Sequence, residues 1–316
     1  MFVGVFEQVL LLLVFCAVGF GLAKAKKADP THTKLLSALE IYVFIPCLTF
    51  NNFAKNFTAE YLSDRYVLII VSGILLVLSY PLAMFLTRFF AKKRYERSLY
   101  HYILMIPNYS YIGYALCQGV YGDMGLLDMM IFVLLMGVYT NSIAYSALTG
   151  GDGKISIKRI FSPAVYATIL GCVVGFSGVA MPGVITEITT KAGACMAPVS
   201  MLLTGIVISE YKLKELFLRK KSYVVAALRL VGIPVLIYGV LKLTCYGFTL
   251  LGLSGVSASV ASVIPYAVIT YCMPCGMNTI VFPKMVGEDC KTGASTVLIS
   301  TVAALITIPL CVTFLK

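Results

Sequence analysis

Two apolar segments of this chain are each interrupted by a proline near the middle. The first contains residues 105–113, with the sequence MIPNYSYIG, and the second contains residues 271–279, with the sequence YCMPCGMNT. Proline lacks a backbone N–H group and disfavours helix at the residue before it, so we expect breaks at Pro107 and Pro274. In hydrocarbon a broken helix is tolerated only where protein or a wet cavity surrounds it. The breaks, which continue to Gly113 and Gly276, therefore predict a site.

The composition is that of an integral membrane protein. Hydrophobic residues make up 59% of the 316 residues, charged residues make up 12%, and the mean hydropathy is +0.92. A membrane span takes about 20 residues, so the chain has room for about ten helices and for no soluble domain. The predicted spans are 4–23, 35–53, 66–90, 98–121, 125–148, 162–181, 190–209, 222–246, 256–283 and 292–315.

The basic residues indicate how the chain is oriented. The net charge of +11 would also suit a nucleic-acid-binding protein, but the Lys and Arg residues lie in short clusters between apolar segments, so we predict no nucleic-acid partner. Nineteen of them fall on one side of the ten spans and five on the other, with Arg229 inside the eighth span. By the positive-inside rule, the loops that carry the nineteen basic residues are cytoplasmic and both termini lie outside. The protein is predicted to lie in the inner or plasma membrane of the cell.

The chain is predicted to contain an internal repeat. Residues 1–148 and 162–316 form two units of five spans, joined by a cytoplasmic linker at 149–161. Because five is odd, the second unit enters the membrane from the opposite side and the repeat must be inverted. The breaks at Pro107 and Pro274 fall in the fourth and ninth spans. Interrupted segments at corresponding places in two halves point to the binding site of a transporter.

The breaks predict an anion site. A broken helix exposes N–H groups with about half a positive charge at one end and carbonyl groups at the other. Two such breaks would cross near the midplane, where the positive ends suit an anion without a buried Lys or Arg. Asn108 and Asn278 add amide donors, and Ser110, Tyr111 and Thr279 add hydroxyl groups. We interpret this set as a carboxylate site; the alternative is that these groups only cap the broken backbone.

Further residues complete the predicted substrate site. Asn141 is expected to extend the polar wall, and Cys275 to line the site as a small residue. Thr49, Asn51 and Ser200 are the candidates on the opposite side.

Neither a metal site, nor a cofactor, nor an enzyme is predicted. Cys272 and Cys275 have Cys-x-x-Cys spacing, but a zinc site takes about four ligands. The chain has no second such pair, and His32 and His101 are its only histidines. So few histidines also leave no plausible Ser/His/Asp or Cys/His set for catalysis.

Four ionisable residues in or at the end of predicted spans are weighed for function: Glu7, Glu40, Glu210 and Arg229. An intramembrane charge is a functional hypothesis by default, but side chains near the ends of a span can reach the interface, and we expect that of all four. Glu7 is the candidate for a proton-coupling carboxylate, and H⁺ and Na⁺ both stay open as coupling ions. Export of an anion is aided by an inside-negative potential, so it could run without a coupling ion.

Several motifs identify a family resemblance. Pro107-Asn108 is followed by Gly113 and Tyr121-Gly122-Asp123, and Pro274-x-Gly276 leads through Val281-Phe282 to Ser300 and Ile308-Pro309-Leu310. These motifs, together with Asn141 and Met196-Ala197-Pro198, resemble the auxin efflux carrier family. That family holds the plant PIN auxin exporters and bacterial permeases for malate, malonate and related acids. Relatives often carry Asn-Pro at the start of the sixth span, where this chain has Ser162-Pro163.

The resemblance implies an all-α integral membrane fold that is PIN-, NhaA- and bile-acid-symporter-like. Its ten transmembrane helices would form two inverted five-helix repeats, with broken crossover helices 4 and 9. Residues 1–60 and 162–212 would form a scaffold part that dimerises, and residues 61–148 and 213–316 a transport part that moves like an elevator. In the plant members the Asn after the first crossover Pro contacts the substrate carboxylate, and Asn108 stands at that position.

We therefore predict a secondary transporter that moves a small organic anion by elevator-type alternating access. The anion is a mono- or dicarboxylate, auxin-like or malate- or malonate-like. The other expected partners are membrane lipids and a second copy of the chain, as a homodimer. Two alternatives stay open: a non-transporting lipid- or sterol-sensing membrane protein on the same fold, and a proton- or sodium-coupled cation exchanger.

Overall fold

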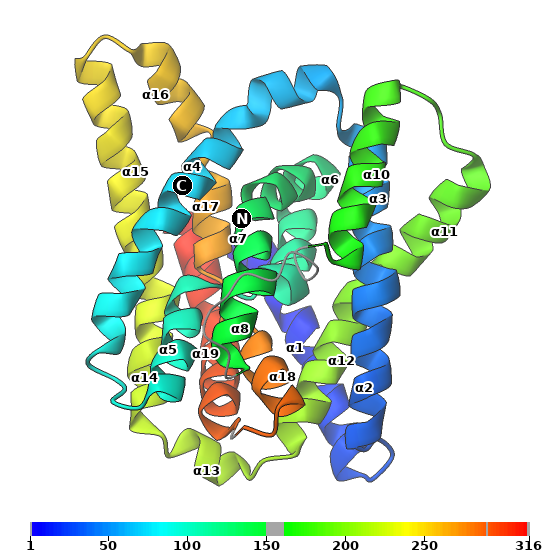
Figure 1. Cartoon of the computed structure of the whole chain (residues 1–316), viewed down its shortest axis with the longest axis vertical. Helices are drawn as coiled ribbons and strands as arrows, with labels where there is room; N and C mark the ends of the chain where they lie inside the picture. The colour runs from blue at the N-terminus through cyan, green and yellow to red at the C-terminus, as the bar shows by residue number, and fades with distance from the viewer. Residues whose placement is uncertain (1, 150–160, 289, 315–316) are drawn as a thin grey trace.

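The computed structural model describes residues 2–149, 161–288 and 290–314, and every regular element within these parts is helical (Figure 1). Wider, π-type turns join some consecutive helices: η1 (Glu40–Phe44), η2 (Tyr109–Gly113), η3 (Thr140–Ala144) and η4 (Leu228–Gly232). The helices are α1 (Phe2–Lys24), α2 (Pro30–Leu39), α3 (Ile45–Asn56), α4 (Ala59–Thr87), α5 (Arg94–Met105), α6 (Tyr114–Phe132), α7 (Leu134–Tyr139), α8 (Tyr145–Leu148), α10 (Pro163–Ser177), α11 (Gly183–Ala194), α12 (Met196–Ser209), α13 (Leu213–Phe217), α14 (Lys220–Ala227), α15 (Ile233–Leu250), α16 (Ser254–Ala261), α17 (Ile264–Tyr271), α18 (Asn278–Met285) and α19 (Lys291–Phe314).

Several of these helices are long and apolar enough to cross a membrane, so the chain is a multi-pass membrane protein. The described parts contain seven such stretches, and an eighth if Tyr109–Phe132 and Leu134–Leu148, bent by 49°, count as one span. The predicted spans 98–121 and 256–283 are not single helices, because each is interrupted near its proline. The seven stretches are Val3–Lys24, His32–Asn56, Ala59–Thr87, Gly183–Ser209, Lys220–Leu250, Ser254–Tyr271 and Lys291–Phe314.

Polar caps and a glycine explain where two of the helices begin and end. The hydroxyl of Thr58 accepts a hydrogen bond from the N–H of Tyr61 (3.1 Å) at the start of α4, and Ser162 accepts one from Val165 (3.4 Å) at the start of α10. Such side chains replace the missing partners of the first N–H groups of a helix. α10 then ends at Gly178, whose φ of 63° is a left-handed conformation that favours glycine.

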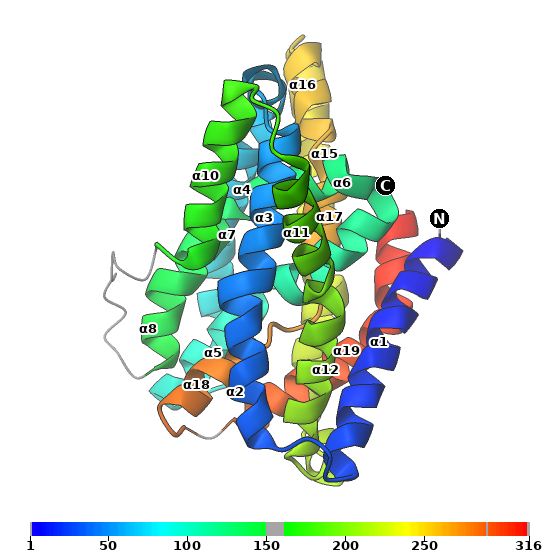
Figure 2. The same cartoon turned by 90° about the vertical axis from the view of Figure 1, so that its right-hand side faces the viewer.

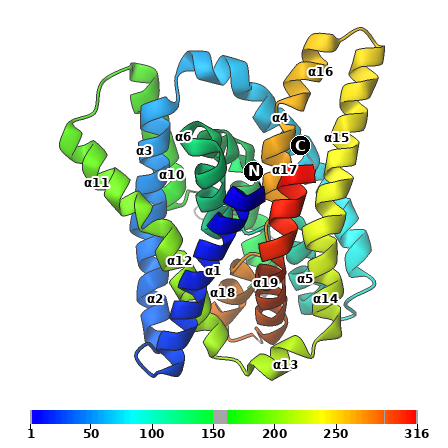
Figure 3. The ribbon, with the colours of Figure 1, turned by 180° about the vertical axis from the view of Figure 1, so that it is seen from behind.

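Two helix pairs pack closely through glycines. Gly19 of α1 faces the backbone of Leu202 in α12, and Gly205 of α12 faces the carbonyl group of Cys16 in α1. Gly175 of α10 likewise faces the carbonyl groups of Phe53 and Phe57, at the end of α3 and just after it. Small residues let membrane helices approach closely. Helices α2, α3, α10 and α11 gather on one side of the molecule and α4, α5, α14 and α15 on the other (Figure 1), while α1 and α19 lie side by side at the back (Figure 3).

A side chain at Gly205 is therefore expected to destabilise the fold. The Cβ atom of Gly205→Val would meet the carbonyl oxygen of Cys16, so α1 and α12 must separate, at a cost of about 1–3 kcal/mol. Thermal unfolding of the purified protein measures this cost as a lower midpoint. Gly239→Val is the matched control, because nothing lies within 4 Å of the Cβ position there. Equal midpoints for the two variants would contradict the packing role.

Candidate functional site

The two interrupted segments meet inside the molecule. After α5 and α17 end, the chain forms a short antiparallel bridge between Pro107 and Cys275. Within it, the N–H of Asn108 donates to the carbonyl oxygen of Pro274 (2.9 Å). All four residues are buried. The bridge thus pairs backbone groups that would otherwise lack partners in the interior.

Side-chain hydroxyl groups form hydrogen bonds with the open backbone groups of the second break. The N–H of Cys275 donates to the hydroxyl oxygen of Ser300 in α19 (3.1 Å), and the hydroxyl of Thr279 donates to the carbonyl oxygen of Gly276 (2.7 Å). Cys275 and Thr279 are both 0% exposed. These two predicted site residues therefore support the broken backbone and do not line the cavity described below.

Arg229 caps the carboxyl ends of α5 and α17, the two helices that lead into the breaks. From η4, its Nη1 donates to the carbonyl oxygen of Leu104 in the last turn of α5 (2.9 Å), and its Nε donates to that of Met273 just after α17 (3.3 Å). The guanidinium also lies 5.7 Å from the ring centre of Tyr271. Arg229 is 0% exposed, so the expectation that it reaches the membrane interface is wrong. A cation in this place neutralises the partial negative charge of two helix ends.

The helices that follow the two breaks have no such counter-charge at their amino ends. η2 begins at Tyr109 and continues into α6, and α18 begins at Asn278; neither start has a side-chain cap in the described structure. The carbonyl oxygen of Asn108 accepts hydrogen bonds from the N–H groups of Ile112 (3.3 Å) and Gly113 (3.1 Å). The first N–H groups of η2 have no partner within their own helix. Both starts therefore keep their partial positive charge.

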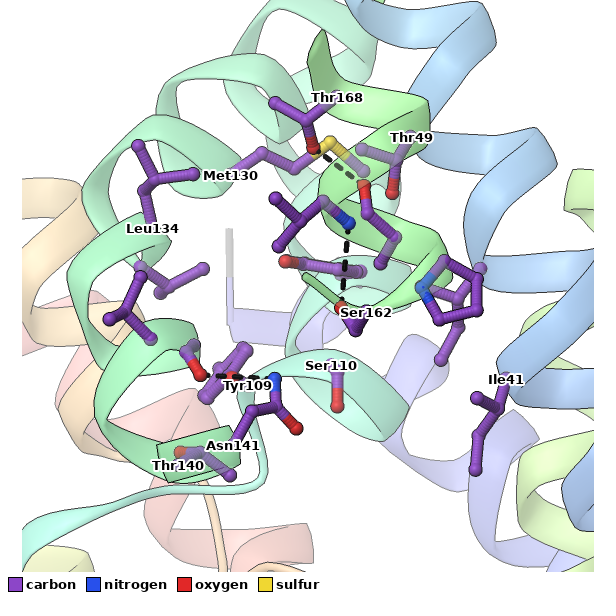
Figure 4. Close-up of a pocket in the computed structure, with 18 of the residues that line it drawn as sticks. Ile41, Thr49, Tyr109, Ser110, Met130, Leu134, Thr140, Asn141, Ser162 and Thr168 are labelled. Carbon is purple, nitrogen blue, oxygen red and sulfur yellow. Dashed lines mark hydrogen bonds between the residues drawn. The ribbon is translucent and has the colours of Figure 1, made fainter. Parts of the chain in front are cut away.

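A cavity of about 190 Å³ adjoins both of these amino ends. Figure 4 shows hydroxyl, phenol and amide groups from α3, η2, η3 and α10 around it. Among the residues that the structure describes, no Asp, Glu, Lys, Arg or His lines it. Neutral donors beside two positive helix ends can bind a small anion without a permanent ion pair. The polar residues of the lining are Thr49, Tyr109, Ser110, Tyr111, Tyr114, Thr140, Asn141, Ser162, Thr168 and Asn278.

Half of the predicted substrate residues line this cavity. Asn278 donates from Nδ2 to the hydroxyl oxygen of Tyr102 (3.2 Å), and Asn141 donates from Nδ2 to the carbonyl oxygen of Gly137 (3.0 Å). Each amide is thus held in place by one hydrogen bond and keeps a second N–H for a ligand. The predicted residues in the lining are Thr49, Ser110, Tyr111, Asn141 and Asn278.

Asn108, Asn51 and Ser200 lie elsewhere. Asn108 is 2% exposed, and its side-chain oxygen is buried with no hydrogen-bond partner among the described residues. Asn51 accepts a hydrogen bond from the hydroxyl of Thr189 in α11 (3.3 Å), and Ser200 donates to the carbonyl oxygen of Met196 (2.7 Å). In this conformation Asn51 and Ser200 bond to other residues, and Asn108 is enclosed by the surrounding helices. A substrate contact at Asn108 stays a prediction.

The structure adds lining residues that we did not predict, among them Tyr109, Thr140, Ser162 and Thr168. Tyr109 lies within the interrupted segment and Thr140 precedes Asn141, so their position beside predicted residues was the available signal. Ser162 caps the start of α10, and Thr168 lies on this helix and donates to the carbonyl oxygen of Ala164 (2.9 Å) (Figure 4). An apolar membrane helix carries little sequence information about which face meets a cavity.

Glu40 is a second buried ionisable residue, and the expectation that it reaches the interface is wrong. It is 0% exposed, and neither carboxyl oxygen has a hydrogen-bond partner in the described part of the chain. Ser200 faces it from α12, but its hydroxyl proton is donated to Met196. Tyr111, which lines the cavity, is an ionisable neighbour of this carboxyl group. Glu7, by contrast, is exposed on α1.

Comparison with known proteins places the whole chain in one family. The family described as membrane transport protein matches residues 4–312. An uncharacterized transporter of Methanocaldococcus jannaschii is 26% identical over 320 residues, with 96% of each chain covered. Another, of Methanothermobacter thermautotrophicus, is 24% identical over 319 residues, with 98% of each covered. The chain therefore belongs to the membrane transport protein family, that of the auxin efflux carriers, and it is a transporter and not an enzyme.

Proposed function

We propose that the protein is a secondary transporter that moves a small organic anion, a mono- or dicarboxylate, through the cavity beside η2 and α18. The asymmetry of the helix ends carries this proposal. Arg229 neutralises the two carboxyl ends, whereas the two amino ends adjoin a cavity whose described lining has no charged side chain. Partial positive charges and neutral donors favour a carboxylate that must later leave. A cation would lie beside two positive helix ends with no carboxylate in the described lining, which disfavours a cation exchanger.

The proposed mechanism is alternating access between two parts of the chain. We take residues 1–148 and 162–316 as inverted repeats with ten spans in all, and the interrupted segments as crossover helices 4 and 9. The antiparallel pairing of the two breaks supports this. The cavity lies between the proposed scaffold, which supplies Thr49 and Ser162, and the proposed transport part, which supplies Ser110 and Asn278. An elevator-like movement of one part past the other would open the cavity to each side in turn, in a homodimer held through the scaffold.

The proposed orientation has both termini outside, in the cell membrane. The basic turns between α1 and α2 and around α13 lie at the same, lower end of the molecule, and the two termini lie in its upper half (Figure 2). Lys24, Lys26 and Lys27 belong to the first of these turns and Lys212 and Lys214 to the second. Basic loops face the cytoplasm in most membrane proteins, which supports a cytoplasmic position for the lower end.

Transport by the purified protein in liposomes tests the proposed function. Liposomes are loaded with labelled malate, malonate or indole-3-acetate, and an inside-negative potential is imposed. We expect at least one anion to leave faster than from protein-free liposomes. Its efflux should accelerate with the potential, because one charge crossing 100 mV gains about 2.3 kcal/mol. The sterol-sensing alternative replaces the carrier under two conditions. No carboxylate leaves faster or changes the thermal stability of the protein, and a sterol does change its thermal stability.

We propose that Glu40, in place of Glu7, binds the proton if transport is proton-coupled. An ionised carboxylate buried without a cation or a hydrogen bond costs several kcal/mol, so a proton on Glu40 stabilises this conformation. Helices α10 and α12, which pack on η1, carry no charged residue. On α11, Glu187 and Lys191 are exposed and pair with each other (2.7 Å).

Glu40→Gln is expected to remove the response of transport to a pH gradient. In the wild type, one pH unit should change anion accumulation by up to about tenfold, since it corresponds to about 1.4 kcal/mol. Glutamine has nearly the same shape but carries no titratable proton, so anion binding measured by thermal shift should persist. Glu7→Gln is the control at an exposed position. Loss of the pH response in that variant, and not in Glu40→Gln, would return the assignment to Glu7.

A further inference from the structure

A second, basic cavity lies next to Tyr102, the residue that bonds to Asn278 of the first cavity. Its volume is about 390 Å³, and it is enclosed by the end of α4, by α5 and by the segment from Tyr139 to Ala147. Arg88, Arg94 and Arg97 line it, and no carboxylate does so among the described residues. Tyr102 forms part of its wall and accepts the hydrogen bond from Asn278 of the first cavity. The two cavities are therefore separate and differ in charge.

The basic turn that forms this cavity is held in place. The N–H groups of Phe90 and Ala91 both donate to the carbonyl oxygen of Thr87 (3.1 Å each), and Lys221 of α14 donates to the carbonyl oxygen of Phe90 (2.7 Å). α5 begins at Arg94 without a side-chain cap in the described structure. The start of a 12-residue helix thus adds its partial positive charge to that of the guanidinium groups.

The surroundings of the cavity combine basic and apolar surface. Tyr80 and Met84, which also line it, are 41% and 45% exposed on α4, one of the membrane-spanning helices. Ile70, Ile74 and Val77 continue this exposed apolar stripe along the same helix at helical spacing. The arginines follow where the helix ends, after Thr87. A cluster of guanidinium groups at the end of an apolar span lies at the level of lipid headgroups.

We propose that this cavity binds the phosphate group of an anionic phospholipid, whose acyl chains lie along the exposed stripe of α4. The planar guanidinium group binds phosphate oxygens in a bidentate manner, and Arg88 and Arg97 line the cavity in a place to do so. Free phosphate has the same chemistry and is the other source of the ligand. This site is independent of the proposed transport function, because neither the arginines nor the stripe belongs to the first cavity.

Titration of the purified protein in detergent with water-soluble, short-chain lipids tests the proposal. The thermal unfolding midpoint is followed against the concentration of dihexanoyl phosphatidylglycerol, dihexanoyl phosphatidylcholine, inorganic phosphate or malate. We expect phosphatidylglycerol to raise the midpoint at the lowest concentration. Arg88→Gln with Arg97→Gln should weaken its apparent affinity by about thirtyfold, because charge-assisted hydrogen bonds to the phosphate are lost. Lys92→Gln with Lys93→Gln removes the same charge from the same turn but outside the cavity lining, so only a screened long-range attraction is lost and the affinity should change less than about threefold.

The outcomes separate the sources of the ligand. An effect of inorganic phosphate that depends on the same arginine pair supports the phosphate site and names free phosphate as its ligand. Equal losses of affinity in the two double variants overturn the proposal, because only the net charge of the surface would then matter. Displacement of the lipid by malate overturns it as well, in favour of a carboxylate. If the arginine pair unfolds the protein, Arg97→Gln alone against Lys93→Gln repeats the comparison.

Discussion

Arg229→Met is expected to lower the free energy of unfolding by about 3–5 kcal/mol. Each hydrogen bond from a charged donor contributes about 1.5–3 kcal/mol, and this guanidinium donates to two buried carbonyl groups, those of Leu104 and Met273. Methionine fills much of the same volume but donates nothing. Both carbonyl groups lose their partner, and the carboxyl ends of α5 and α17 keep their partial negative charge. Unfolding by heat and by denaturant in detergent measures the loss.

Two further variants distinguish charge from geometry at this position. Arg229→Lys keeps the positive charge but lacks the planar fork that reaches both carbonyl groups, so we expect an intermediate stability. Lys242→Met removes a cation from an exposed position of the neighbouring helix α15 and should change the free energy of unfolding by less than about 0.5 kcal/mol. If Arg229→Met is as stable as wild type, the carboxyl ends need no counter-charge. The charge asymmetry of the helix ends would then no longer support the proposed anion site.

The helix breaks could be predicted from sequence because proline acts locally. Pro107 and Pro274 each remove a backbone N–H donor, and gaps follow α5 and α17 accordingly, whereas α4 and α19 continue through Pro81 and Pro309. The pairing between the breaks needed the structure. The hydrogen bond from Asn108 to the carbonyl group of Pro274 depends on how two distant segments align, and no local rule sets that alignment.

The positions of the buried charges could not be predicted, because hydropathy reports depth in the membrane and not the direction of a side chain. Each π-type turn in the described chain carries residues of interest: Glu40 in η1, Tyr109 in η2, Asn141 in η3 and Arg229 in η4. Such a turn holds one more residue than an α-helical turn, so it changes which face the following residues present. No composition or spacing in this sequence marks the insertion, and the helices around it are apolar on both their lipid and their protein faces.

Asn278→Ala is expected to weaken carboxylate binding by about 10- to 100-fold. Asn278 begins α18 and lines the first cavity, and one of its two amide protons is donated to Tyr102. The other is available to a ligand. A hydrogen bond to a charged acceptor contributes about 1.5–3 kcal/mol, and about 1.4 kcal/mol corresponds to tenfold in affinity. Thermal-shift titration with malate, malonate or indole-3-acetate, whichever stabilises the wild type, gives the apparent dissociation constants.

Asn108→Ala and Tyr102→Phe complete this test. The family resemblance assigns the carboxylate contact to Asn108, but here that side chain is buried beside the bridge and does not line the cavity, so we expect a smaller loss of affinity than for Asn278→Ala. Tyr102→Phe removes the hydroxyl that holds Asn278 and leaves the amide in place, so a loss of about threefold to tenfold is expected. If Asn108→Ala abolishes binding and Asn278→Ala does not, the anion binds at the bridge between Pro107 and Cys275. The cavity in Figure 4 would then belong to a conformation that does not hold the substrate.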